Sequence, residues 1–145
     1  MPSTRSTIVV DANLAVWAIL PVAAPVDAIG LFADWHRQEL RLVAPALWLA
    51  ECASAVRSGV YAGALSEEEG RTALEDLFAL EVETLPLTLQ QTRSAFEWAR
   101  RLRLAQAHDG FYLALAQELG AEFWTGDRRL EHRAQQAGAG WVHAV

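Results

Sequence analysis

The stretch STIVVDANLAVWAIL, residues 6–20, decides the fold class of this 145-residue chain. Residues 6–10 are rich in β-branched side chains and predict a short strand. Residues 13–20 then read as a helix that ends at Pro21. The acid Asp11 stands between the two elements. Strands that alternate with helices in this way build a mostly parallel sheet.

The same alternation continues to the end of the chain. Further strands are predicted at residues 40–44, 81–87, 121–124 and 140–144, and further helices at residues 25–38, 45–58, 66–80, 88–104, 109–119 and 128–137. Pro45 suits the first turn of a helix, Ser66 and Glu69 form a capping-box pattern, and Gly120 suits a helix stop. We therefore expect an α/β protein, a three-layer α/β/α sandwich with a central sheet of four to five strands, in a single domain over residues 1–145.

The composition is that of a globular protein without a zinc cage. Hydrophobic residues make up 52% and charged residues 21%, which argues against disorder. No apolar run reaches the roughly 18 residues that span a bilayer, and Asp11 interrupts what would be a short signal core, so we expect a cytoplasmic protein. Cys52 is the only cysteine and the four histidines lack close ligand spacing, which makes zinc an unfavourable choice.

The charge balance excludes several mechanisms. A net charge of −6 argues against binding nucleic acid mainly through a basic surface. All twelve positive side chains are arginines, so Schiff-base, P-loop and receiver-type chemistry have no lysine to use. Arginine still binds phosphate through two parallel hydrogen bonds, and a local phosphate-binding surface remains compatible with the acidic total.

Four acids fall at one edge of the predicted sheet. They follow a strand, lie early in the helix after a strand, or head a helix that leads into one: Asp11, Glu51, Asp109 and Asp127. Crossover helices of parallel sheets begin near the edge where the strands end, and ligands bind along that edge. Four carboxylates there would raise one another's pKa unless a divalent ion neutralised them, and an all-oxygen set suits Mg²⁺ or Mn²⁺.

Helix capping is the other interpretation for three of these acids. Asp11, Asp109 and Asp127 each stand at the predicted start of a helix, where a carboxylate accepts hydrogen bonds from free backbone N–H groups. Glu51 lies inside a helix on a largely apolar face and has no capping role. A cap can also bind a metal, so both interpretations stay open. His108, beside Asp109, is typical of an incidental loop histidine.

Four segments carry a resemblance to a known family. VVDANL, PALWLAE, HDGFYLALAQELG and FWTGDRRL, in this order, resemble the PIN-domain nucleases, in particular the VapC-type toxins of type II toxin–antitoxin pairs. The resemblance covers essentially the whole chain. It implies a PIN-like fold and a metal-dependent endoribonuclease that hydrolyses RNA phosphodiester bonds with Mg²⁺, Mn²⁺ being a possible substitute.

The resemblance also assigns roles to residues. It implies that Asp11, Glu51, Asp109 and Asp127 are catalytic and bind the metal, and that Asn13 and Thr125 support them. The chain departs from the family at Ala12-Asn13, where Ser or Thr commonly follows the first acid, and at Gly110, where Ala commonly follows the third. Neither change removes a carboxylate.

Partners follow from the same resemblance. It implies an RNA substrate, a small cognate antitoxin and a homodimer; the absence of a long apolar run separately predicts no membrane association. Arg128 and Arg129, directly after Asp127, are candidates for binding the RNA backbone. The run Arg100, Arg101 and Arg103 is typical of a solvated helix face.

Two other classes of function stay in view. One is a PIN fold kept as a non-catalytic binding module, against which the presence of all four acids argues. The other is a phosphoacceptor signalling domain, which would carry a lysine near its acids. A haloacid-dehalogenase-type phosphatase would have a second aspartate two residues after the first, and position 13 is Asn.

Overall fold

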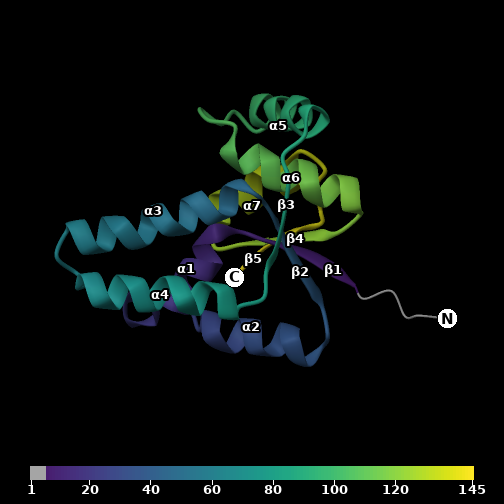
Figure 1. Ribbon diagram of the computed structural model, residues 1–145. Helices are drawn as coiled ribbons and strands as arrows, with labels where there is room; N and C mark the ends of the chain where they lie inside the picture. The colour runs from purple at the N-terminus through teal and green to yellow at the C-terminus, as the bar shows by residue number, and fades with distance from the viewer. Residues whose placement is uncertain (1–5) are drawn as a thin grey trace.

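A parallel sheet with helices on both faces forms the centre of the computed structural model, which describes residues 6–145 (Figure 1). The strands are β1 (Thr7–Val10), β2 (Arg41–Pro45), β3 (Glu83–Leu85), β4 (Glu122–Thr125) and β5 (Val142–Ala144). The helices are α1 (Ala12–Ile19), α2 (Ala28–Arg37), α3 (Leu47–Tyr61), α4 (Glu67–Ala79), α5 (Leu89–Arg101), α6 (His108–Leu119) and α7 (Arg128–Gln136), with a 3₁₀ turn η1 (Pro21–Ala23). The first five residues of the expected single domain, where the possible signal segment begins, lie outside the described residues.

All five strands are parallel, in the order β3-β2-β1-β4-β5. The central strand is β1, in which Val9 pairs with Val43 of β2 on one side and with Phe123 of β4 on the other. The chain runs outward from β1 to β3, then crosses to β4 on the opposite side. This confirms the predicted α/β sandwich and places a reversal of strand order between β1 and β4.

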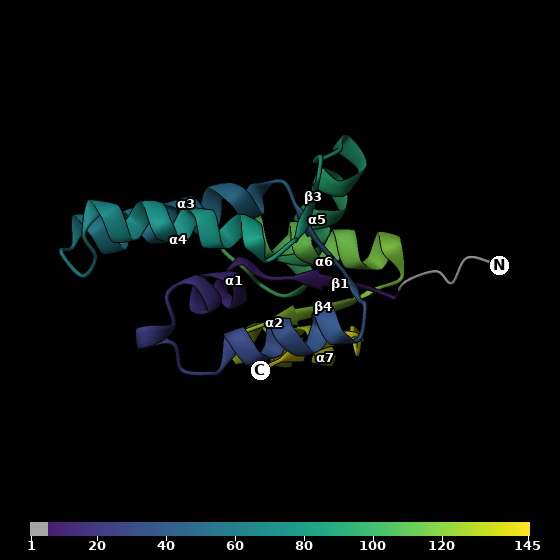
Figure 2. The ribbon, with the colours of Figure 1, turned by 60° about the horizontal axis from the view of Figure 1, so that its bottom comes forward.

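Helices cover both faces of the sheet. Figure 2 shows α6 and α2 on opposite sides of the strands. On one face Tyr112 of α6 stacks on Phe123 of β4, with ring centroids 5.4 Å apart. On the other face Trp35 of α2 meets Trp124 of β4 edge to face. Successive strand residues thus face opposite layers, as a buried parallel strand requires. Helix α5 packs on α6, and α3 pairs with α4.

Two predicted helix starts are wrong. Pro45 does not open the helix after β2: it is the last residue of β2, paired with Leu85, and α3 begins at Leu47. A proline is tolerated at the end of a strand because no further ladder hydrogen bond depends on its missing N–H. Helix α2 begins at Ala28 rather than at residue 25, because the Asp27 carboxylate accepts a hydrogen bond from the Gly30 N–H at 2.9 Å and caps the helix there.

Other helix ends follow the local signals. The capping box of Ser66 and Glu69 is confirmed, with both hydrogen bonds 3.0 Å long. Gly120 stops α6 in the left-handed conformation. Helix α5 ends at Arg101, earlier than predicted, and Arg103 just beyond it has a left-handed φ of 56°. Among residues 6–145, no helix has the length and apolar character needed to cross a membrane.

Candidate active site

The predicted acids lie along the sheet edge where the strands end, beside the reversal of strand order. Asp11 follows β1, and its backbone N–H donates to the carbonyl of Trp124 in β4 at 2.9 Å. Thr125 ends β4, so the ends of β1 and β4 stand side by side. In open parallel sheets a crevice forms where the strand order reverses, because the chain leaves the two neighbouring strands in different directions.

Asp11 is buried and carries an unusual carboxyl group. Its side chain is 5% exposed and makes no capping hydrogen bond to α1; its Oδ2 instead accepts from the Thr125 hydroxyl at 2.8 Å. Burial, followed by the charges of Asp109 and Glu51, raises the pKa of Asp11 to about 7, against the lowering effect of the Thr125 hydrogen bond. A bound cation would stabilise the ionised form of a carboxyl group that is buried beside other acids.

Thr125 links the first acid to the last. Its hydroxyl donates to Asp11 and accepts from the backbone N–H of Asp127 at 3.0 Å and from the Asn13 amide at 3.5 Å. The Asn13 carbonyl oxygen accepts from the Gly126 N–H at 3.0 Å. These bonds tie the loop after β4 to the start of α1. The role of Asn13 and Thr125 in orienting a ligand or water stays a prediction.

Glu51 has a partner that the sequence did not reveal. The hydroxyl of Tyr112 on α6 donates to Glu51 Oε1 on α3 at 2.8 Å. Burial and the charge of Asp109 raise the pKa of Glu51, whereas the Tyr112 bond and nearby His108 lower it. Tyr112 is fully buried, and burial next to the acids raises its own pKa, which keeps its hydroxyl protonated and able to donate.

Asp109 and Asp127 both lie at the start of a helix, but only Asp127 caps its helix. Asp109 lies in the first turn of α6, whose N-cap is Ala107, so Asp109 does not occupy the capping position. Burial and the charge of Asp127 raise the pKa of Asp109, and His108 lowers it. Asp127 is exposed and caps α7, accepting from Arg129 N and Leu130 N at 3.0 and 3.1 Å. The capping interpretation therefore holds for Asp127 alone.

The charges of the four acids influence one another's titration, but their side chains do not surround a common metal position. Asp109 raises the pKa of both Asp11 and Glu51, and Asp127 raises that of Asp109. In residues 6–145, no three His, Cys, Asp or Glu side chains are placed so that they could together hold a metal ion. Three carboxylates are instead tied to Thr125, Tyr112 and the first turn of α7. The set has the oxygen chemistry of a divalent-cation site but not a finished ligand shell.

A comparison with protein families identifies the family of this chain. The model of the PIN domain matches residues 8–136. The chain belongs to the PIN-domain family. Members of this family are nucleases that use divalent metal ions, so this PIN domain has the fold of an enzyme that hydrolyses nucleic acid. No protein of curated function matches its sequence.

Solved structures share the fold of this PIN domain at low sequence identity. VapBC2 from Rickettsia felis bound to a DNA fragment from their promoter has a TM-score of 0.69 at 15% identity, covering 96% of this chain and 98% of that chain. PAE2754 from Pyrobaculum aerophilum has a TM-score of 0.63 at 18% identity, covering 88% and 79%. A toxin-antitoxin complex from Klebsiella pneumoniae has a TM-score of 0.60 at 14% identity, covering 95% and 99%. The fold is thus conserved where the sequence is not.

The cysteine of the PIN domain is buried next to the acids Glu51 and Asp11. Cys52 follows Glu51 on α3 and is fully buried, with its Sγ 3.9 Å from the carbonyl oxygen of Ala12. Burial, then the charges of Glu51 and Asp11, raises the pKa of Cys52 to about 12. Its thiol is therefore protonated at neutral pH and acts as a small apolar side chain between α1 and α3.

Replacement of Tyr112 by Phe tests the contact with Glu51. Phe keeps the ring stack on Phe123 and removes only the hydroxyl, so we expect the pKa of Glu51 to rise and the protein to lose about 1–3 kcal/mol of stability at pH 8. The pKa is measured by NMR titration and the stability by urea denaturation, both without metal. Tyr61→Phe is the control, because Tyr61 is 86% exposed. Equal behaviour of the two variants would contradict the assigned contact.

Proposed function

We propose that this PIN domain is a Mg²⁺- or Mn²⁺-dependent endoribonuclease and the toxin of a toxin–antitoxin pair. The observation that carries the proposal is the coupling of the acids: the charges of Asp109 and Glu51 raise the pKa of Asp11, the charge of Asp109 raises the pKa of Glu51, and the charge of Asp127 raises the pKa of Asp109. Within residues 6–145, none of the salt bridges involves these acids or Asp127. Carboxylates that are partly desolvated and unpaired favour a hard divalent cation.

In the proposed reaction the metal ion and the protein side chains have different roles. Asp11, Glu51, Asp109 and Asp127 are the proposed ligands and catalytic acids. A bound divalent ion would supply Lewis acidity and activate water near neutral pH. The chain positions the ligands: Thr125 fixes Asp11, Tyr112 fixes Glu51, and Asn13 holds the loop that leads to Asp127. The bound ion would also offset the acidic charge that otherwise repels a phosphodiester.

Partners of the proposed toxin are inferred from the structural relatives. The Rickettsia felis structure is a VapBC2 assembly and the Klebsiella pneumoniae structure is a toxin-antitoxin complex, which supports a small cognate antitoxin for this chain. We further propose a homodimer that acts on RNA in the cytoplasm, with Arg128 and Arg129 near the entry of the substrate. A gene for a small protein next to the gene of this chain would support the toxin role over a free-standing nuclease.

Metal dependence is the first test of the proposal. We expect Mn²⁺ or Mg²⁺ to support cleavage of at least one RNA in a panel of tRNA, rRNA and mRNA, and EDTA to abolish it. Asp109→Asn is expected to lower the rate by about 100-fold or more, because several kcal/mol of charge stabilisation depend on the bound ion and each 1.36 kcal/mol corresponds to about tenfold.

Asp76→Asn is the matched control for Asp109→Asn, because it removes an exposed carboxylate on α4. Cleavage that survives both EDTA and Asp109→Asn would rule out the metal site. A folded protein that binds Mn²⁺ but cleaves no RNA would instead favour a non-catalytic binding module.

A further inference from the structure

Arginines gather on the exposed side of α7, at the end of α5 and on the loop after α5. We call this surface the arginine groove; it comprises Arg101, Arg103, Arg128, Arg129 and Arg133. None of these arginines forms a salt bridge with a carboxylate in residues 6–145, whereas Arg37, Arg41, Arg57 and Arg100 do. A protein with a net charge of −6 thus keeps a concentration of unneutralised positive charge on one surface.

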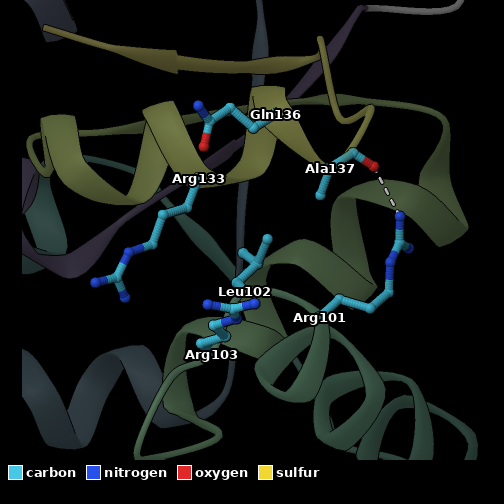
Figure 3. Close-up of a pocket in the computed structure, with 6 residues that line it drawn as sticks. All are labelled: Arg101, Leu102, Arg103, Arg133, Gln136 and Ala137. Carbon is cyan, nitrogen blue, oxygen red and sulfur yellow. Dashed lines mark hydrogen bonds between the residues drawn. The ribbon is translucent and has the colours of Figure 1, made fainter.

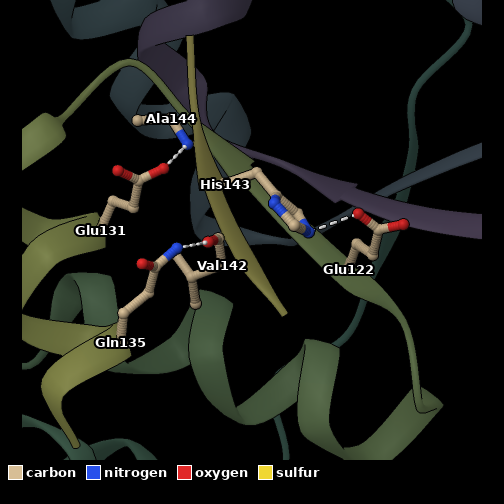
Figure 4. A network of polar contacts seen from close by, with 6 residues as sticks. All are labelled: Glu122, Glu131, Gln135, Val142, His143 and Ala144. Atoms are coloured by element: carbon tan, nitrogen blue, oxygen red, sulfur yellow. Dashed lines mark hydrogen bonds and ion pairs between the residues drawn. The ribbon is translucent and has the colours of Figure 1, made fainter. Parts of the chain in front are cut away.

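Helix α7 is held so that its arginines face outward. Its other side lies against β5, where the Glu131 carboxylate accepts from Ala144 N and the Gln135 amide donates to the Val142 carbonyl (Figure 4). The polar side chains that face the sheet are used in these bonds, and Leu130 and Ala134 are buried. Arg129 and Arg133 stand one turn apart on the free side, about 6 Å along the axis.

Two hollows lie along this surface. One, of about 490 Å³, is lined by Arg101, Leu102, Arg103, Arg133, Gln136 and Ala137 (Figure 3). The other, of about 350 Å³, is lined by Arg128, Arg129, His132 and Arg133. Arg133 lines both hollows, so the two are neighbours along α7.

Arg101 builds one wall of the groove. Its Nη2 donates to the carbonyl oxygen of Ala137 at 2.7 Å, and its guanidinium lies 4.3 Å from the ring centroid of Trp98. The first contact satisfies a free carbonyl at the end of α7 and holds the end of α5 beside it. Figure 3 shows the side chains of Arg103 and Arg133 entering the hollow from the loop and from α7. Arg103 and Arg133 therefore remain free for a ligand.

Both sides of the groove are connected along the chain to residues of the candidate active site. Arg128 directly follows Asp127, and the loop that carries Arg103 leads into the first turn of α6, where Asp109 lies. We propose that the arginine groove binds the sugar-phosphate backbone of single-stranded RNA next to the scissile bond. Guanidinium groups that repeat at one helical turn suit a chain of phosphates, and binding them releases condensed counterions.

The choice of RNA rests on the proposed ribonuclease function, since an acidic peptide would offer the same charge. The position of the groove favours RNA: a strand cleaved at the acids must continue along the surface on one side or the other, and Arg128 of the groove directly follows Asp127 in the chain. A peptide bound for its charge alone would need no such connection to the acids.

Arg103→Gln with Arg133→Gln tests the groove. The matched control is Arg71→Gln with Arg93→Gln, which removes the same charge from exposed arginines of α4 and α5 that form no salt bridge in the described part of the chain. Binding of a fluorescent single-stranded RNA is measured in EDTA, so that no cleavage is required. We expect about tenfold weaker binding for the groove variant than for the control, and a salt dependence reduced by about 0.7 in log–log slope per arginine lost.

Cleavage separates the groove from the catalytic proposal. With Mn²⁺, the groove variant should show a raised KM for a long RNA, an unchanged kcat, and unchanged kcat/KM for a trinucleotide that reaches only the acids. If the wild type binds RNA through these arginines but does not cleave it, the proposed ribonuclease falls and the groove stands. The groove proposal is wrong if both double variants bind RNA equally well. It is also wrong if the groove variant binds a polyglutamate peptide more weakly than the control does but binds RNA as well as the control.

Discussion

Asp11→Asn is expected to stop RNA cleavage while making the metal-free protein more stable at neutral pH. Asn keeps the shape of the side chain and can still accept the hydrogen bond of Thr125, so the fold is preserved. It removes the charge that the proposed metal requires. We expect the rate to fall by about 100- to 1000-fold, since several kcal/mol of transition-state stabilisation depend on the ion.

The stability effect follows from the raised pKa of Asp11. The pKa is 3.8 without burial and about 7 in the folded protein. Between these values the unfolded chain has released the proton and the folded protein still holds it, so stability falls as the pH rises from about 4 to about 7 and is then constant. The loss is on the order of 4 kcal/mol at about 1.36 kcal/mol per pH unit. The Asn variant cannot ionise and escapes most of this loss.

Urea denaturation in EDTA at pH 5 and at pH 8 measures this difference. We expect wild type to be clearly weaker at pH 8, the variant to change little, and Mn²⁺ to restore only the wild type at pH 8. A variant that is less stable than wild type at pH 8 without metal would show that Asp11 contributes to the fold as a charged group, and the site would need another explanation.

Gly110→Ala is expected to destabilise the protein by about 3 kcal/mol, at the upper end of the usual range for overpacking. A methyl group at position 110 would stand 2.3 Å from the carbonyl oxygen of Ala95 and 2.9 Å from its carbonyl carbon. These are backbone atoms of α5, a helix packed along α6, and neither can turn aside. Relief requires α5 and α6 to move apart, which would displace Asp109, the neighbour of Gly110.

The sign of this effect distinguishes packing from helix propensity. An exposed glycine in a helix loses stability relative to alanine by roughly 0.5–1 kcal/mol, so propensity alone predicts that Gly110→Ala stabilises. Urea denaturation decides between the two. Gly140→Ala is the control, because a methyl group there meets no atom within 4 Å, and it should change stability by less than about 0.5 kcal/mol. A stable Gly110→Ala protein would mean that the two helices separate easily.

Local signals explain what the sequence predicted well. The β-branched run before Asp11, the capping box at Ser66 and the stop at Gly120 each depend on a few neighbouring residues, and each is found where it was expected. The alternation of strand and helix then brings the ends of the strands, with their acids, to one edge. The PIN fold and the position of the acids along one edge of its sheet could therefore be predicted from the chain alone, whereas their role as shared metal ligands stays a prediction.

Contacts between distant segments explain what the sequence did not predict. The contact of Tyr112 with Glu51 could not be predicted, because Glu51 lies 61 positions away in the chain and only the packing of α6 on the sheet brings the two together. The need for glycine at position 110 depends on how closely α5 approaches. Pro45 carries signals for both a helix start and a strand end, and its pairing with β3 decided between them. A polar tip within an otherwise apolar helical run was the one signal available for Tyr112.

The buried thiol under the acids has a practical consequence. Cys52 is the single cysteine of the chain, its pKa is about 12, and its sulfur is enclosed between α1 and α3. A thiol-directed reagent can modify Cys52 only while these two helices are apart. The rate of modification therefore depends on local opening of the structure next to Asp11 and Glu51. The rate at which Cys52 is modified therefore measures how often α1 and α3 separate next to the candidate active site. A ligand that bridges the acids would make this separation rarer and the modification slower.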